Sequence, residues 1–190
     1  MTDATTRLQK HFETLNAGEI YWREKYRWLL DSGYRLRPRY HPDWVPSWKT
    51  NPRLNDVACE DSIINHRIAI CDAVKVDDNS PVILKRVSQG SNTEELEIVR
   101  YLAEEPRKSD PRNHSVPIFD ILQPPDHPSE QILVMALCRR WDSPEFETTG
   151  EAADCIRQLL EGVRYLHENR IAHRYCLSSP ILCRMLTFCQ

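Results

Sequence analysis

The chain has 190 residues, of which 41% are hydrophobic and 28% are charged, and its formal net charge is −3. This composition is typical of a globular protein, and the length allows one domain with a core and a smaller appendage. The charge balance provides no basic footprint for nucleic acid, and the longest apolar run, residues 132–138, is too short to cross a bilayer. We therefore expect no nucleic-acid partner and no membrane partner.

Seven cysteines are scattered along the chain without a C-x-x-C pair, and the N-terminus has no apolar stretch of the secretory type. This pattern predicts reduced thiols and an intracellular location, either cytoplasmic or nuclear. It also predicts no metal site built from cysteines. Thirteen prolines against five glycines indicate many stiff loops and few positions that favour a positive φ.

Residues 3–32 have the apolar spacing of a helix, with a break predicted near residues 16–18 and a stop at Gly33. The simplest interpretation is a helix that packs on the rest of the domain, and the alternative is a docking helix for a partner. Residues 34–62 contain four prolines and two tryptophans without a clear period, which predicts an irregular segment. Its rings either pack on the following part or present a peptide-binding surface. Together, residues 1–62 are predicted to form an N-terminal helical and Pro/Trp-rich extension.

The remainder of the chain alternates between strand and helix patterns. Residues 66–76 and 81–87 predict a hairpin around a turn at 77–80, and a helix is predicted to open near residue 92 and to end before Pro106. Two further strands are predicted at 116–122 and 131–138. Thr148 and Glu151 predict a capped helix that ends near Asn169. The predicted order is strand, strand, helix, strand, strand, helix, in an α+β fold.

The stretch 159–175, LLEGVRYLHENRIAHRY, contains the most specific motif. It consists of a helix ending in V-R-Y-L-H at residues 163–167, which corresponds to an L-x-x-L-H ending with valine first, a short turn, and then I-x-H-R at residues 171–174. This order resembles the helix and catalytic loop of a protein kinase, in which H-R-D follows the turn. Residues 34–62 with the part that follows resemble, more weakly, a fungal group of kinase-like proteins.

The resemblance implies a protein-kinase-like small lobe at 63–138, made of an antiparallel sheet plus one helix. The first helices of the large lobe would follow at 139–190, where the lobe is incomplete and truncated. The family transfers a phosphoryl group from ATP, with Mg²⁺, to serine or threonine of a protein. A protein partner or substrate is therefore implied, although the sequence does not say which.

The resemblance assigns phosphate binding to Lys85, which stands in V-I-L-K at the end of a predicted strand, as in the family's V-A-I-K. Glu95 on the next helix would orient Lys85, with Glu94 as the alternative. Main-chain groups near Ala136 and Cys138 would meet the edge of the adenine. Without the resemblance, the sequence predicts that Lys85 is an ordinary surface lysine and that Glu94 and Glu95 are solvated carboxylates on a helix.

His173 and Arg174 match the catalytic loop by position, and the alternative is a purely structural pair. Tyr175 stands where the family has the catalytic aspartate, and a phenol with an ordinary pKa near ~10 is a poor substitute for a carboxylate base. Pro180 stands where the metal-binding asparagine is expected, and the sequence ends at Gln190 without a D-F-G motif. We therefore predict no phosphoryl transfer by these residues, and no metal ligand is assigned.

The small lobe departs from the family as well. Residues 64–76 contain no glycine, so the phosphate-cradling loop is missing, and Ile83 replaces the alanine of V-A-I-K. ATP binding is therefore in doubt. Two further hypotheses remain open: a pseudokinase-type protein-interaction module, or a non-functional frame-shifted product. The third hypothesis predicts aggregation through the uncovered apolar face of the helix at 150–169.

Overall fold

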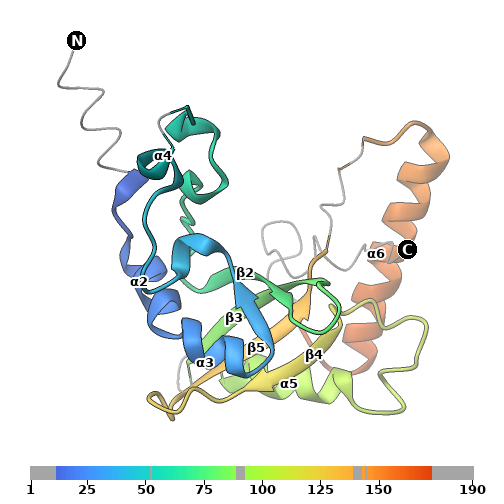
Figure 1. Cartoon of the computed structure of the whole chain (residues 1–190). Coiled ribbons are helices and arrows are strands. Elements are labelled where there is room, and N and C mark those ends of the chain that lie inside the picture. Colours follow the sequence, from blue (N-terminus) through green and yellow to red (C-terminus); the bar gives the residue numbers. More distant parts are fainter. Residues whose placement is uncertain (1–11, 52, 89–92, 139–142, 144, 173–190) are drawn as a thin grey trace. The chain divides into compact units, whose positions relative to one another are not determined.

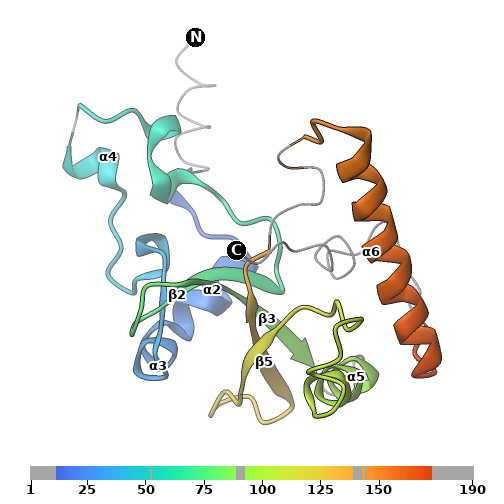
Figure 2. The same cartoon turned by 90° about the vertical axis from the view of Figure 1, so that its right-hand side faces the viewer.

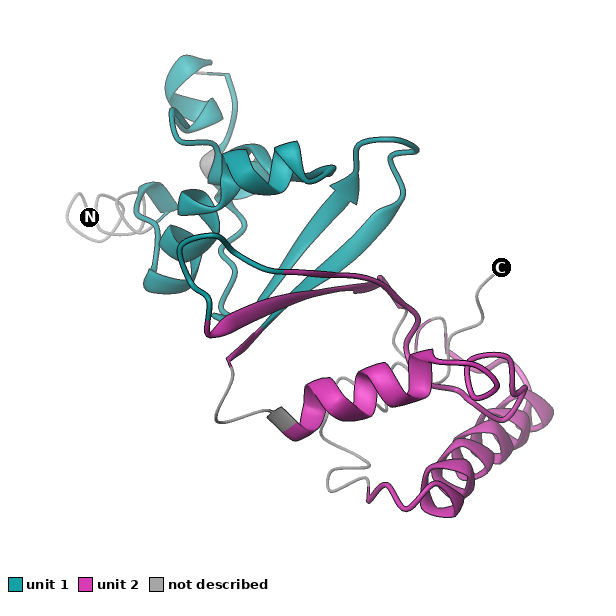
Figure 3. Cartoon of the chain, turned by 90° about the horizontal axis from the view of Figure 1, so that it is seen from below, with its two compact units in different colours: residues 1–86, 123–128 teal, residues 87–122, 129–190 magenta. Residues whose placement is uncertain are grey.

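The computed structural model describes residues 12–51, 53–88, 93–138, 143 and 145–172 (Figure 1). These residues form helices and antiparallel strand pairs, which confirms the predicted α+β class. The chain divides into two compact units: residues 1–86 with 123–128, and residues 87–122 with 129–190 (Figure 3). The kinase-like lobes and the domain boundaries after residues 62 and 138 stay predictions.

The first unit opens with helices α2 (Ala17–Glu24) and α3 (Tyr26–Asp31). Asn16 caps α2 in a complete capping box, in which its side chain accepts the Glu19 N–H at 3.0 Å and Glu19 Oε2 accepts the Asn16 N–H at 3.0 Å. Gly33 follows α3 with a φ of +91°, a conformation that favours glycine. The predicted break near residues 16–18 and the stop at Gly33 are confirmed. Residues 1–11 of the predicted helix lie outside the described residues.

The segment after Gly33 is mostly irregular, as predicted. It contains β1 (Tyr34–Leu36), α4 (Ser47–Thr50) and the short 3-10 helices Pro38–Tyr40, Asp56–Ala58 and Glu60–Ser62. Asp61 holds part of it together, because its carboxylate accepts from Trp44 Nε1 at 3.0 Å and from the Ser47 N–H at 2.9 Å. The Trp44 ring meets Trp48 edge-to-face with centroids 6.4 Å apart. These contacts lie within residues 34–62, so the choice between packing on the following part and a peptide-binding surface stays open.

The predicted hairpin is confirmed as β2 (Ile70–Lys75) and β3 (Pro81–Ser88), which pair antiparallel (Figure 1). Asn79 takes a positive φ of 56° in the turn, and the Lys75 N–H donates to the Ser80 carbonyl at 2.9 Å. β1 pairs with β2 on the other side, so this unit has three strands in the order β1-β2-β3. The sequence analysis missed β1, since three residues followed by Pro38 are too short for a strand period.

The register gives this small sheet two different faces, because directly opposite residues of antiparallel strands point to the same side. One face consists of the buried residues Tyr34, Leu36, Cys71, Ala73, Val82 and Leu84, with the partly buried Lys75 opposite Tyr34. Next along β3 on that face, Arg86 lies over the Tyr21 ring at 4.4 Å, which places α2 against this side of the sheet (Figure 2). The face toward α2 is therefore the core of this unit.

A buried ion pair joins the N-terminal helices to the irregular segment. Glu19 and Arg39 are both 0% exposed, and Arg39 Nε lies 2.8 Å from Glu19 Oε1. Arg39 also donates to the Phe12, Thr14 and Asp61 carbonyls, while Glu19 accepts the Asn65 N–H at 3.2 Å. Burial alone raises the pKa of Glu19, but the bonds from Arg39 and from the Asn16 and Asn65 N–H groups lower it overall.

We expect the stability of this unit to fall in acid. The pKa of Glu19 is lowered on folding, and so is that of Asp61, where burial raises it but the bonds from Ser47 and Trp44 outweigh burial. A carboxylate with a lowered folded pKa stabilises above its unfolded pKa, and this contribution disappears as the pH falls through the folded value. Urea unfolding followed by circular dichroism should therefore show the loss as the pH falls below about pH 5. A flat profile over that range in the native chain, or an unchanged slope in Glu19→Gln, would contradict this assignment.

The second unit contains α5 (Thr93–Ala103), β4 (Ile118–Leu122), β5 (Glu130–Ala136) and α6 (Thr149–Glu168). All four elements were predicted, and β4 pairs antiparallel with β5. Thr148 caps α6 by accepting the Glu151 N–H at 3.2 Å. The Glu151 carboxylate accepts the Glu147 N–H at 2.9 Å instead of the Thr148 N–H, so the predicted capping box is only half formed.

The end of α6 packs on α5 (Figure 1). Leu102, Tyr165 and Leu166 form a buried cluster, against which the partly buried residues Ile98, Leu159, Val163 and Ile171 pack. Hydrogen bonds at the margin join the same elements, since Tyr101 Oη donates to Asn169 Oδ1 at 3.1 Å. The loop before β4 contacts α6 as well, where His114 Nε2 lies 3.0 Å from Glu161 Oε2.

The apolar face that the sequence predicts on α6 contains Ala152, Ile156, Leu159, Leu160 and Val163. Ile156 is 58% exposed and Leu160 is 60% exposed, which is the exposure that the third hypothesis predicts for this face. The buried face is rotated toward Cys155, Gly162 and Leu166. At Gly162 an added Cβ would lie 3.4 Å from the His114 side chain, so the small residue lets the loop approach closely. Across the described residues, no helix has the length and apolarity needed to span a membrane.

Candidate functional site

Lys85 lies near the end of β3, where the sequence placed it, and its side chain is partly buried. It pairs directly with Ile70 of β2, so it belongs to the sheet face that points away from α2. Ile83 lies on the same face and is only 5% exposed. The strand therefore holds Lys85 in a fixed direction, as the resemblance requires, with the bulky Ile83 beside it.

Asp72 shares this face with Lys85. Asp72 pairs with Ile83, two residues from the Ile70–Lys85 pair, which makes Asp72 and Lys85 diagonal neighbours. Diagonal neighbours on one face lie about 7–8 Å apart, within reach of long side chains. A carboxylate is thus placed beside the predicted phosphate-binding cation. The sequence analysis did not single out Asp72, because its position relative to Lys85 depends on the register.

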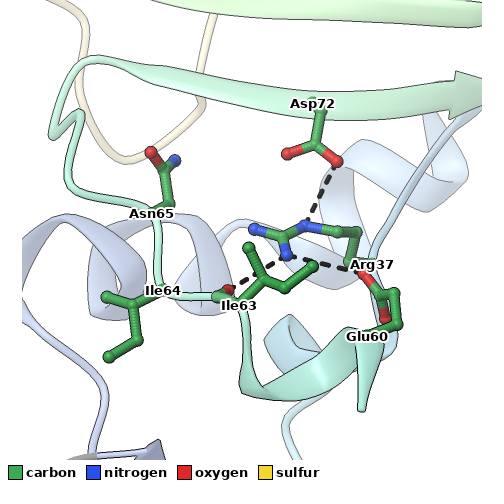
Figure 4. Close-up of a pocket in the computed structure, with 6 residues that line it drawn as sticks. All are labelled: Arg37, Glu60, Ile63, Ile64, Asn65 and Asp72. Carbon is green, nitrogen blue, oxygen red and sulfur yellow. Dashed lines mark hydrogen bonds and ion pairs between the residues drawn. The ribbon is translucent and has the colours of Figure 1, made fainter. Parts of the chain in front are cut away.

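Arg37 and Asp72 form part of an open pocket of about 350 Å³ in the first unit (Figure 4). Its other lining residues are Glu60, Ile63, Ile64 and Asn65. Arg37 Nε lies 3.1 Å from Asp72 Oδ2 and one terminal nitrogen lies 3.5 Å from Glu60 Oε1. The first contact is an ion pair without hydrogen-bond direction, since Arg37 Nε has no hydrogen-bond partner.

Further bonds fix the Arg37 side chain, which is 15% exposed. It donates to the Ile63 carbonyl at 3.1 Å and to Tyr40 Oη at 3.0 Å. Burial alone lowers the pKa of Arg37, but the neighbouring Tyr40, Asp72 and Glu60 raise it overall. Burial raises the pKa of the Tyr40 hydroxyl, which therefore stays a neutral partner. Arg37 is accordingly a structural cation that is held through its two terminal nitrogens.

The predicted partner of Lys85 lies in the second unit. Glu95 is partly buried on α5, whereas the alternative, Glu94, is exposed. Ile98 and Leu102 follow Glu95 on the same face of α5. They pack in the hydrophobic cluster with Tyr165 and Leu166 of α6. Lys85 and Glu95 belong to different units, and their pairing stays a prediction.

The predicted adenine-contacting residues lie at the end of β5. Ala136 and Cys138 are buried and Leu137 is 48% exposed. The Ala136 N–H donates to the Pro117 carbonyl at 3.0 Å, and the Cys138 thiol approaches the Ala136 carbonyl at 3.5 Å. The Ala136 N–H is therefore already used within its own unit, which leaves it a poor donor for an adenine.

The catalytic-loop residues His173, Arg174 and Tyr175 lie outside the described residues. The helix that leads to them is confirmed, and it closes with the Asn169 N–H donating to the Tyr165 carbonyl at 3.1 Å. Arg170 then takes a positive φ of 61°, and the Ile171 N–H donates a hydrogen bond to the Leu166 carbonyl at 2.9 Å.

Comparison with known proteins gives no assignment. No family model and no curated protein matches the chain. The kinase resemblance therefore rests on the residues quoted above.

The binding of magnesium and ATP that the resemblance implies stays a prediction, since the residues that the resemblance assigns to the catalytic loop lie outside the described ones. Among the described residues, no group of three or more histidine, cysteine or acidic side chains is placed to hold a metal ion. Asp72 beside Lys85 opposes a polyphosphate by like charge. The described parts can supply a rigid scaffold, a fixed lysine and a pocket with acidic rims.

Proposed function

We propose that the chain is a protein-kinase-like domain that works as a protein-interaction module and does not transfer phosphate. The position of Asp72 carries this proposal. A carboxylate that is 49% exposed lies on the same face as Lys85, at a diagonal position, and within the described part of the chain it pairs with Arg37. A polyphosphate would have to approach both Lys85 and this negative charge.

The sequence supports the same conclusion independently. Tyr175 and Pro180 stand in place of the catalytic aspartate and the metal-binding asparagine, and residues 64–76 lack glycine. The order of elements and the placement of Lys85 on β3 support the kinase-like part of the proposal. The exposed apolar side chains of the first unit, among them Val45, Val57 and Ile63, support the interaction part.

We expect Mg-ATP to leave the thermal unfolding temperature unchanged. A ligand stabilises the folded state by RT ln(1 + [L]/Kd), so a nucleotide at about 100 times its Kd would contribute about 2.7 kcal/mol and produce a clear shift. Differential scanning fluorimetry of the native chain and of Lys85→Ala, each with and without Mg-ATP, tests this. A shift in the native chain that disappears in Lys85→Ala would contradict the proposal and support nucleotide binding instead.

The same preparation tests the third hypothesis. An interaction module must be folded, and size-exclusion chromatography should then give one monodisperse species with a cooperative unfolding transition. Aggregates without such a transition would support the non-functional product.

A further inference from the structure

We propose that the Arg37 pocket, lined by Arg37, Glu60, Ile63, Ile64, Asn65 and Asp72, binds a lysine or arginine side chain from an extended segment of a protein partner. This inference rests on the proposed function, because it names the chemistry that the interaction module recognises. The pocket is built entirely from the first unit.

The pocket combines an apolar wall with an acidic rim (Figure 4). Ile63 is 59% exposed and Ile64 is partly buried, so both leave aliphatic surface facing solvent. Long cationic side chains bury their methylene stems on such surface while the charged end reaches a polar group. The pocket therefore fits a long basic side chain and not a compact ion.

Both carboxylates at the rim retain acceptor capacity. Asp72 is 49% exposed and Glu60 is 53% exposed, and each contacts Arg37 through a single oxygen. A carboxylate has two oxygens and about four acceptor positions, so Asp72 Oδ1 and Glu60 Oε2 are open to a second donor. Figure 4 shows the second oxygen of Asp72 pointing away from Arg37 toward the side of the pocket where Asn65 lies.

The charge of the pocket selects a cation. One arginine and two carboxylates leave a formal charge of one negative unit, and Arg37 is itself only 15% exposed. Its donors already reach the Ile63 carbonyl and Tyr40 Oη, so it offers little to a phosphate or an acidic peptide. An anionic guest would also meet Glu60 and Asp72 at the rim. A basic guest meets complementary charge.

Asn65 makes the wall rigid. Its side-chain amide donates to the Ile70 carbonyl and its Oδ1 accepts the Arg67 N–H at 2.9 Å, while its own N–H donates to Glu19. The pocket is thus anchored to β2 and to the buried Glu19–Arg39 pair, so that little ordering is needed on binding.

The test is a titration followed by nuclear magnetic resonance of the isotopically labelled chain. The probe is the peptide acetyl-Val-Lys-Val-Lys-Val-amide, compared with the same peptide carrying glutamate in place of lysine, and with spermidine. We expect the lysine peptide to shift the amide signals of Ile63, Ile64 and Asn65. The double variant Glu60→Gln with Asp72→Asn should bind it about tenfold more weakly, since two half-exposed ion pairs are lost. Asp77→Asn, which removes an exposed carboxylate in the hairpin turn, is the matched control and should bind normally.

Four results would overturn the inference. Three of them are no shifts with the lysine peptide, equal binding by the double variant, and equal binding of the glutamate peptide. The fourth is spermidine binding as tightly as the peptide, because the pocket would then be a general amine site. If the double variant is unfolded, the peptide titration is repeated with Glu60→Gln alone. Glu60 is the more distant of the two carboxylates from Arg37, so its substitution disturbs the fold less. If the lysine peptide does not bind and Mg-ATP leaves the unfolding temperature unchanged, this inference fails but the proposed function stands. If Mg-ATP raises the unfolding temperature, the proposed function itself is refuted.

Discussion

Replacing Arg39 with methionine is expected to lower the free energy of unfolding by about 3–5 kcal/mol, because Glu19 then remains as an uncompensated buried charge. Both side chains are 0% exposed, and the distance between Arg39 Nε and Glu19 Oε1 is 2.8 Å. The substitution also removes the donors to the Phe12 and Asp61 carbonyls, both at 2.8 Å. Unsatisfied buried acceptors add to the loss.

Urea unfolding measured by circular dichroism at neutral pH is the test of Arg39→Met. Arg35→Met is the matched control, because Arg35 is exposed and its bond to Asn79 Oδ1 lies at the surface, so a change within about 1 kcal/mol is expected. Adding Glu19→Gln to Arg39→Met should recover part of the loss by removing the stranded charge. Equal effects of the two arginine substitutions would contradict the assigned role of the buried pair.

Leu166→Ala is expected to destabilise the second unit by about 2–5 kcal/mol, the usual cost of deleting a buried leucine side chain. Leu166 is 2% exposed and packs in the cluster with Leu102 and Tyr165. Leu160→Ala on the same helix is the matched control, since Leu160 is 60% exposed and its loss should change the unfolding free energy by no more than about 0.5 kcal/mol.

The two leucine variants distinguish two apolar stripes of α6. Leu166 lies on the packed stripe, and Leu160 lies with Ile156 on the exposed one. Thermal and urea unfolding of both variants, each compared with the native chain, measure the difference. A larger loss in Leu160→Ala than in Leu166→Ala would show that the helix packs through Ile156 and Leu160 in solution, contrary to the structure.

Elements with strong local signals were predictable from the sequence. The hairpin at 70–88 has a turn of polar residues between two β-branched runs, and α6 begins at a threonine cap and has regular apolar spacing. β1 was missed because its stability comes from pairing with β2 and not from its own three residues. Apolar spacing predicted α6 as a helix but could not choose between its neighbouring apolar stripes, since Ile156 and Leu160 are exposed whereas Cys155 and Leu166 are buried.

The candidate site was only partly predictable for a related reason. The position of Lys85 on a strand and the inward side of Glu95 follow from local patterns. The pocket brings together residues 37, 60–65 and 72, which no spacing rule connects. The position of Asp72 beside Lys85 depends on strand register, and a shift of one residue would move Asp72 to the other face.

The central proposal, that the chain does not transfer phosphate, is tested most directly by a transfer assay with radiolabelled Mg-ATP and a generic protein substrate. We predict that incorporation by the native chain equals that of Lys85→Ala, because Tyr175 replaces the base and Asp72 opposes the phosphates. Transfer by the native chain that Lys85→Ala abolishes would contradict the claim and make the chain an active enzyme.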